Sequence, residues 1–399
     1  MPGITRFVFV TVCVIALLSL TVGSAGALPP QAPKAKWTVM VYMAGDNNLE
    51  TFITSDIETE LAPAGSNADV QIVALADRIP GFDQSAGDWN GTLIFHVTKG
   101  MTATPNNAVA DLGEGNTGDP QTLIDFVSWT KTNFPADHYA LVFWGHGWSW
   151  RPGFTMFDQT SNDTLDLDEI ARAIPSIGFM DVVAYDGCNM GAIETEALWQ
   201  GHARAIAHSE EFVGADGLEY EKVIPALQAN PQISADELAP LFSQSAQGNK
   251  EKTWSAVALD ERWDALQTAV DEWAVALMNG LPTDRKAYDQ AFNGARSFWQ
   301  DPASKDLYDA ALEIKMRVKD PVIQAKSQAV MDAVNAAILD EWHVNAYRDV
   351  RGITIYLPHR VKQLNYRSTP GNDFEYYRAN FGFASQTHWD EFLAAYLTP

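Results

Sequence analysis

Short continuous apolar runs recur along the chain up to Leu259, and each of them predicts a strand that is covered on both faces. These runs are 37–42, 70–76, 92–97, 139–144, 182–185, 203–207 and 255–259. Between them, apolar residues recur at helical spacing, as in the segment that follows Asp119-Pro120. This alternation predicts an α/β fold in which helices flank a mostly parallel central sheet.

The pattern changes near Asp260, after which the helical periods become longer. Predicted helices cover 261–278, 284–299, 306–318 and 322–342. A late apolar run at 352–357 predicts one more strand, and the pattern leaves open whether that strand returns to the sheet. We therefore expect a core at 37–259 and a helix-rich C-terminal region at 260–399 that packs on it.

The N-terminus has the pattern of a secretory signal. Arg6 precedes an apolar run over 7–22, and small residues at 25–27 suit a cleavage site. We expect a signal peptide at 1–27, a Pro-rich lead-in at 28–36 and a secreted or extracytoplasmic mature protein. No stable membrane span is expected after cleavage.

The charge balance excludes several classes of partner. The chain has 51 acidic and 27 basic residues, and its formal charge is −24 at pH 7. Nucleic acids and anionic membranes need a basic face, so neither is an expected partner. A strongly like-charged surface also favours a monomer in solution.

The mature protein is expected to contain a single cysteine. Of the two cysteines, Cys13 lies in the predicted signal peptide, which leaves Cys188 alone in the mature chain. Cys188 follows the buried run at 182–185, and apolar residues at helical spacing come after it. A lone thiol at a strand end and a helix start suits a thiolate nucleophile, whereas the alternative is an inert buried thiol.

One of the eight histidines also lies at the end of a predicted strand. His146 lies between two glycines directly after the run at 139–144, and 188 − 146 = 42 residues separate it from Cys188. If the two strands are neighbours, imidazole and thiol face each other across one crevice. The amides of Gly147 and Cys188 would then form an oxyanion hole.

At these residues the chain resembles the clostripain family of cysteine peptidases, which have a caspase-like fold. The resemblance covers most of the mature chain, and it rests on the ordered stretches 37–49, 139–147, 186–190, 209–220 and 352–358. It implies that His146 and Cys188 are the catalytic residues and that the partners are peptides or proteins with basic residues. Two departures are Gly145, where the family often has Asp or Asn, and Leu218, where it often has Trp.

The family cleaves after Arg or Lys, and its specificity pocket is acidic. The matching positions are Asp186 and Asp216, which are 216 − 186 = 30 residues apart. A carboxylate beside a nucleophilic thiol disfavours the thiolate, so pairing with a cationic substrate would give Asp186 a compensating role. The alternative is that Asp186 only closes its own turn before Gly187.

A calcium loop is a weaker hypothesis. Oxygen-bearing residues fall at EF-hand-like spacing over 158–169, but Asp163 stands where a glycine is needed. Glu169 more simply belongs to the first turn of the following helix. We expect no required cofactor and no metal ligand set, while calcium stays open because some relatives use it.

The leading hypothesis is a secreted cysteine endopeptidase, and two alternatives stay beside it. One is a non-catalytic extracellular binding module on the same fold, and the other is a transpeptidase or ligase using the same dyad. Many relatives cut themselves after a basic residue in the loop behind the catalytic histidine. Here that loop offers only Arg151, which Pro152 follows, so we expect a single chain or one that is trimmed only near Lys34 or Lys36.

Overall fold

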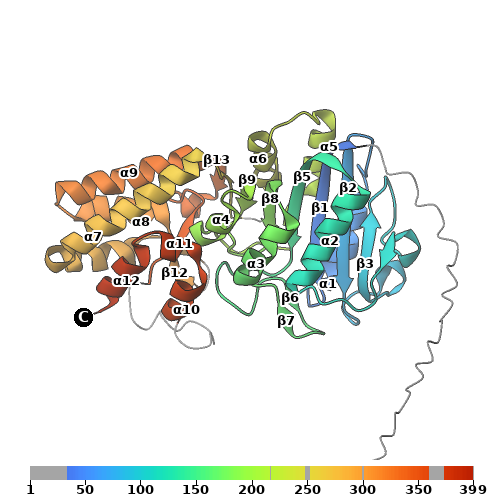
Figure 1. Ribbon diagram of the computed structural model, residues 1–399, viewed down its shortest axis with the longest axis horizontal. Helices are drawn as coiled ribbons and strands as arrows, with labels where there is room; N and C mark the ends of the chain where they lie inside the picture. The colour runs from blue at the N-terminus through green and yellow to red at the C-terminus, as the bar shows by residue number, and fades with distance from the viewer. Residues whose placement is uncertain (1–33, 216, 248–251, 299–300, 359–372, 399) are drawn as a thin grey trace, which may run out of the picture.

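A nine-stranded mixed sheet forms the centre of the protein (Figure 1). The structure, a computed structural model, describes residues 34–215, 217–247, 252–298, 301–358 and 373–398. The strand order is β13 (Ile338–His343), β10 (Thr253–Ala258), β9 (Ala203–His208), β8 (Met180–Asp186), β5 (Ala136–Trp144), β1 (Ala35–Gly45), β2 (Val70–Arg78), β3 (Gly91–His96) and β4 (Ala110–Asp111). Strands β9 to β2 are parallel, and antiparallel strands complete both edges. Each apolar run predicted up to Leu259 is a strand, which confirms the fold class.

Helices cover both faces of this sheet. One face packs against α2 (Pro120–Asn133), α3 (Leu167–Ile177) and α4 (Ile193–Trp199). The other face packs against α1 (Glu50–Ser55), the π-helical turn η1 (Asp56–Leu61), α5 (Tyr220–Ala229) and α6 (Ala235–Ser245). Neighbouring residues of β5 therefore enter different cores, Phe143 on the first face and Val142 on the second. Burial on both sides explains why the central strands have continuous apolar sequences.

The C-terminal region lies beside the β13 edge of the sheet (Figure 1). Its helices are α7 (Glu261–Gly294), α8 (Leu307–Arg317), α9 (Pro321–Ala337), α10 (Asp373–Asn380), α11 (Gly382–Gln386) and α12 (Trp389–Leu397). A small sheet joins β11 (Ser297–Phe298), β12 (Asp301–Asp306) and β14 (Thr354–Tyr356). Trp263, Trp273 and Trp389 belong to the same apolar cluster as the first face of the central sheet. The C-terminal helices thus share a core with the sheet.

The strand that returns to the central sheet is not the late run at 352–357 that the sequence analysis considered for this role. Helix α9 ends at Ala337, and residues 338–343, which we expected to be helical up to Trp342, form β13 beside β10. The late run becomes β14, which pairs with β12 in the small sheet. All six residues of β13 are partly exposed. A half-exposed edge strand mixes polar and apolar residues, so its pattern was not separable from the preceding helix.

Some expectations fall on residues that the structure does not describe. The predicted signal peptide, Cys13 and Asp216 all lie outside the described residues. Across the part of the chain that is described, no helix has the length and apolar character needed to cross a membrane.

A buried arginine ties the segment after β5 to the C-terminal region. The Arg151 side chain is 5% exposed, and its Nε and Nη2 donate to Asp301 at 2.9 and 3.0 Å. Its Nη1 donates to the buried carboxylate of Asp373. The guanidinium also lies over the rings of Trp150 and Tyr356. Two acidic residues distant in sequence therefore fix the position of this one side chain.

We expect Arg151→Met to lower the free energy of unfolding by about 3–5 kcal/mol, because two buried carboxylates lose their counterion. Arg172→Met is the matched control. Arg172 also pairs with two carboxylates, but its side chain is 60% exposed on α3, and we expect a loss below about 1 kcal/mol. Urea denaturation of both variants measures the difference. Equal losses would show that Arg151 does not anchor the segment.

Candidate active site

Parallel pairing of β5 with β8 brings the chain segments of His146 and Cys188 together. Trp144 is aligned with Asp186 in this pairing, so the chain leaves both strands at the same level. His146 and Cys188 each lie two residues farther along, at the carboxyl edge of the sheet. This is the edge at which open α/β sheets bind ligands. The condition set in the sequence analysis, that the two strands are neighbours, is therefore met.

Glycines allow the two turns at this edge to touch through their backbones. A Cβ atom on Gly147 would lie 2.6 Å from the carbonyl oxygen of Cys188, and one on Gly187 would lie 2.9 Å from that of Gly145. Such contacts are too short for a real side chain, so a larger residue would push the turns apart. The glycines beside His146 and Cys188 therefore set how closely these two residues approach.

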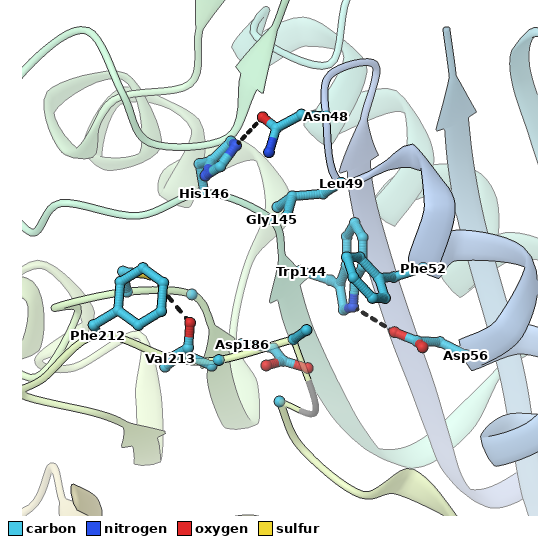
Figure 2. A pocket seen from close by; sticks show the side chains of 15 residues that line it. Asn48, Leu49, Phe52, Asp56, Trp144, Gly145, His146, Asp186, Phe212 and Val213 are labelled. Atoms are coloured by element: carbon cyan, nitrogen blue, oxygen red, sulfur yellow. Dashed lines mark hydrogen bonds between the residues drawn. The ribbon is translucent and has the colours of Figure 1, made fainter. Parts of the chain in front are cut away.

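A cavity of about 290 Å³ opens beside the two turns (Figure 2). Its wall combines the turns with segment 48–56, with residues 212–215 and with Gly217. The lining residues include Asn48, Leu49, Phe52, Asp56, Trp144, His146, Asp186, Cys188, Phe212 and Val213. Cys188 is a partly exposed free thiol, and its Sγ lies 3.6 Å from the carbonyl oxygen of Val213. The structure thus places both candidate catalytic residues in one cavity.

The His146 imidazole is held as a neutral base. Its Nε2 lies 3.0 Å from Oδ1 of Asn48, which comes from the turn after β1 (Figure 2). An amide oxygen only accepts hydrogen bonds, so this contact places the imidazole hydrogen on Nε2, and the lone pair on Nδ1 is available to take a proton. Burial lowers the pKa of His146 to about 4, so the ring is uncharged at neutral pH. The Phe154 ring lies 4.9 Å away, centroid to centroid.

Asp186 lines the same cavity and is bound by a distant segment. Tyr220 Oη donates to its Oδ2 at 2.8 Å, and the Leu218 N–H lies 3.3 Å from both carboxylate oxygens. Gly217 has φ +48°, and a Cβ atom there would lie 2.6 Å from Oδ1 of Asp186. These partners are 32 and 34 residues away, so Asp186 does more than close its own turn.

Asp56 adds a carboxylate to the cavity wall that the sequence analysis missed. Its Oδ2 accepts a hydrogen bond from Trp144 Nε1 at 2.8 Å, and burial raises its pKa to about 7. A second hollow of about 430 Å³ shares Asp56 with the cavity and is lined also by Glu60, Glu219 and Glu221. The cavity therefore opens onto an acidic surface.

Asn47 and Asn48, in the turn before α1, contact groups that are distant in the sequence. Leu49 is the N-cap and makes no side-chain capping bond. Asn47 Nδ2 donates to the carbonyl oxygens of Ala44 and Phe157, and Asn48 contacts His146. Polar residues ahead of a helical pattern are typical of caps. No local pattern shows that Asn48 meets a histidine 98 residues away.

The EF-hand-like frame falls across a β-hairpin and the start of a helix. Residues 158–169 belong to the hairpin of β6 (Phe157–Asp158) and β7 (Asp163–Thr164) and to the start of α3. Asp166 and Glu169 form the capping box of α3, and the Asp166 carboxylate also accepts the Gly153 N–H. Glu169 is thus in the first helical turn, as expected.

Comparisons with known proteins identify the family of this chain. The sequence model of the clostripain family matches residues 41–396. Clostripain from Hathewaya histolytica is 23% identical over 413 aligned residues, which cover 84% of this chain and 77% of clostripain.

Two solved structures have a similar fold. One is a secreted C11 cysteine protease from Bacteroides thetaiotaomicron in complex with an irreversible peptide inhibitor, with a TM-score of 0.65 and 17% identity over 90% of this chain and 100% of that chain. The other is an inactive zymogen C11 protease from Parabacteroides distasonis, with a TM-score of 0.63 and 16% identity over 89% of this chain and 99% of that chain. Since the family model matches nearly the whole described chain, this protein belongs to the clostripain family of cysteine endopeptidases.

Proposed function

We propose that this protein is a secreted endopeptidase that cleaves after Arg or Lys through a dyad of Cys188 and His146. The observation that carries the proposal is that a free thiol and a neutral imidazole, from the ends of adjacent strands, line one cavity with two carboxylates. A thiol becomes a nucleophile when a nearby base takes its proton, and His146 is in the protonation state to do so.

The mechanism follows from these groups. His146 Nδ1 takes the proton of Cys188 Sγ, and the thiolate attacks the scissile carbonyl carbon. The amides of Gly147 and Cys188 stabilise the oxyanion that develops. His146 then returns the proton to the leaving amine, and water hydrolyses the thioester that remains. Asn48 orients the imidazole through its hydrogen bond with Nε2.

Specificity for a basic residue is supported by the acidic wall. Asp186 and Asp56 both line the cavity, and Asp56 continues into the hollow formed by Glu60, Glu219 and Glu221. A carboxylate pairs bidentately with a guanidinium or singly with an ammonium group. We extend the pocket to Asp216 on the basis of the family resemblance.

Secretion is supported by the signal-like pattern at 1–27 and by the description of a similar Bacteroides thetaiotaomicron protease as secreted. The strongly acidic chain suits extracellular peptide substrates with basic residues and neither nucleic acid nor anionic membranes. A non-catalytic binding module is disfavoured because thiol and imidazole both line the cavity.

Fluorogenic peptides that differ in the residue before the cut test the proposed function. We expect turnover with Arg or Lys at that position, and background rates for Cys188→Ala and His146→Ala. His138→Ala is a matched control at the opposite end of β5 and should keep wild-type activity. Iodoacetamide should label one thiol in the mature protein and abolish turnover. Turnover by Cys188→Ala would contradict the proposal, and peptide-joining products would instead support a transpeptidase.

The role of Asp186 has a separate test. We expect Asp186→Asn to lower kcat/KM for an Arg peptide by roughly 30-fold to several thousand-fold, the effect of removing one partner of a desolvated ion pair. The matching citrulline peptide, which is uncharged, should lose far less, and the rate of Cys188 alkylation should stay near that of wild type. Equal losses for both peptides would assign Asp186 to holding Leu218 and Tyr220 in place.

The enzyme should work as a single chain. Arg151 precedes Pro152, and its guanidinium is held by Asp301 and Asp373, so it cannot enter a substrate pocket without breaking two buried ion pairs. Arg172 lies inside α3, where the backbone is protected from cleavage. Active enzyme should run as one band near the full mature size on a denaturing gel. A new N-terminus between residues 148 and 180 that is absent in Cys188→Ala would contradict this expectation.

A further inference from the structure

An exposed aromatic ring lies against the imidazole of His146. Phe154 belongs to the loop between β5 and β6, and its ring makes an interplanar angle of 50° with the imidazole at the 4.9 Å separation given above. The ring also packs edge-on against Trp148, with 5.6 Å between the centroids, yet the residue stays 37% exposed. A single exposed apolar side chain needs no explanation on an ordinary surface. This one borders the imidazole that the proposed mechanism uses.

Phe154 and the cavity contact the imidazole from different places. His146, Asp186 and Cys188 line the cavity (Figure 2), whereas Phe154 lies outside the set of described residues that form its wall. In the proposed mechanism the side chain before the cut enters the cavity, and His146 protonates the leaving amine, which must therefore come within hydrogen-bonding distance of the ring. Successive side chains of an extended peptide point to opposite sides. The first side chain after the cut is therefore expected outside the cavity, beside the imidazole.

The loop that carries Phe154 closes on itself next to His146. The Met156 N–H donates to the carbonyl oxygen of His146 at 2.8 Å, and the Trp148 N–H lies 3.3 Å from Oγ1 of Thr155. Met156 has φ +46°, a backbone conformation that persists only where the surrounding structure holds it. These contacts fix the position of the aromatic ring relative to the imidazole.

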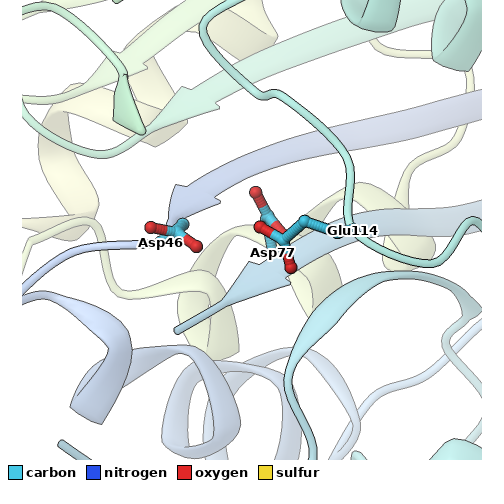
Figure 3. A group of neighbouring side chains, drawn as sticks. All are labelled: Asp46, Asp77 and Glu114. Atoms are coloured by element: carbon cyan, nitrogen blue, oxygen red, sulfur yellow. The ribbon is translucent and has the colours of Figure 1, made fainter. Parts of the chain in front are cut away.

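Other elements hold the loop from outside. The Gly153 N–H donates to both carboxylate oxygens of Asp166, at 2.8 and 3.0 Å, and Asp166 begins α3 as its N-cap. Beyond β6, the N–H groups of Gln159 and Thr160 donate to the backbone oxygen and to Oδ1 of Asp46. Asp46 directly follows β1 at the carboxyl edge of the sheet (Figure 3). The loop is thus tied to α3 on one side and to β1 on the other.

We propose that Phe154 forms the subsite for the residue after the cut and that this subsite favours an apolar side chain. The inference rests on the proposed peptidase function and adds a second determinant of specificity to it, on the leaving-group side. An aliphatic or aromatic side chain would cover the exposed ring and remove apolar surface from water. Glycine has no side chain to do so, and a charged group would lose hydration. Because the ring is already held in place, the contact requires little ordering when the substrate binds.

Digestion of a denatured protein mixture by the wild-type enzyme, followed by mass spectrometry of the peptides, identifies the residues on both sides of every cut. The residue before the cut tests the proposed function, and the residue after it tests the Phe154 subsite separately. We expect the ratio of Leu, Met and Phe to Gly after the cut to exceed their ratio in the substrate proteins by at least about 3-fold.

Quenched fluorescent peptides with Arg before the cut and either Leu or Gly after it measure the contribution of the ring. We expect Phe154→Ala to lower kcat/KM for the Leu peptide by about 10-fold, the effect of losing an apolar contact, and for the Gly peptide by less than about 3-fold. Phe154→Leu should retain most of the preference, because it keeps an apolar side chain at the site. Phe179→Ala is the matched control, since Phe179 is an exposed phenylalanine directly before β8 at the opposite edge of the sheet, and both rates should stay at wild type.

Three results would overturn the inference. The first is a wild-type digest with no apolar preference after the cut, and the second is an unchanged preference in Phe154→Ala. The third is an equal loss for the Leu and Gly peptides in Phe154→Ala together with slower alkylation of Cys188, which would assign the ring to holding His146. Cuts after residues other than Arg or Lys would contradict the proposed specificity alone, because the residues that follow those cuts still decide the role of Phe154. A wild-type protein that cuts nothing would contradict both proposals.

Discussion

The geometry of the proposed active site depends on the backbone contact between the turns that follow β5 and β8. Because Trp144 and Asp186 are paired, a one-residue slip would move His146 by about 3.3 Å along its strand and reverse its side-chain direction. A misplacement of about 1 Å can already cost a large part of the rate in a positioned reaction. Gly147 and Gly187 are thus required for close approach, and each keeps a carbonyl oxygen of the other turn within contact distance.

The sequence predicted this centre of the fold well because its strands are buried on both faces. Continuous apolar runs ended by glycine located β5 and β8 and the two residues that follow them. The edge was less predictable, since β13 is half exposed and carries a mixed pattern. Asn48 and Asp56 were missed for another reason. Asn48 lies in the turn between β1 and α1 and Asp56 begins η1, and only the tertiary fold reveals that both line the cavity.

Buried carboxylates are compensated at several places in this chain, whose formal charge is −24. Asp301 and Asp373 share the guanidinium of Arg151, and Asp186 accepts hydrogen bonds from Tyr220 and Leu218. Both arrangements compensate buried carboxylates with groups from distant parts of the chain.

The Arg151 network also bears on how the enzyme can be divided for engineering. A fragment that stops near Leu259 would keep the guanidinium but lose both of its carboxylate partners. The change in composition at residue 260 is therefore a poor place to cut, since the segment behind His146 obtains its support from the far side of that point. Expression fragments, fusions and circular permutants need to retain Asp301 and Asp373, because these carboxylates compensate the buried charge of Arg151.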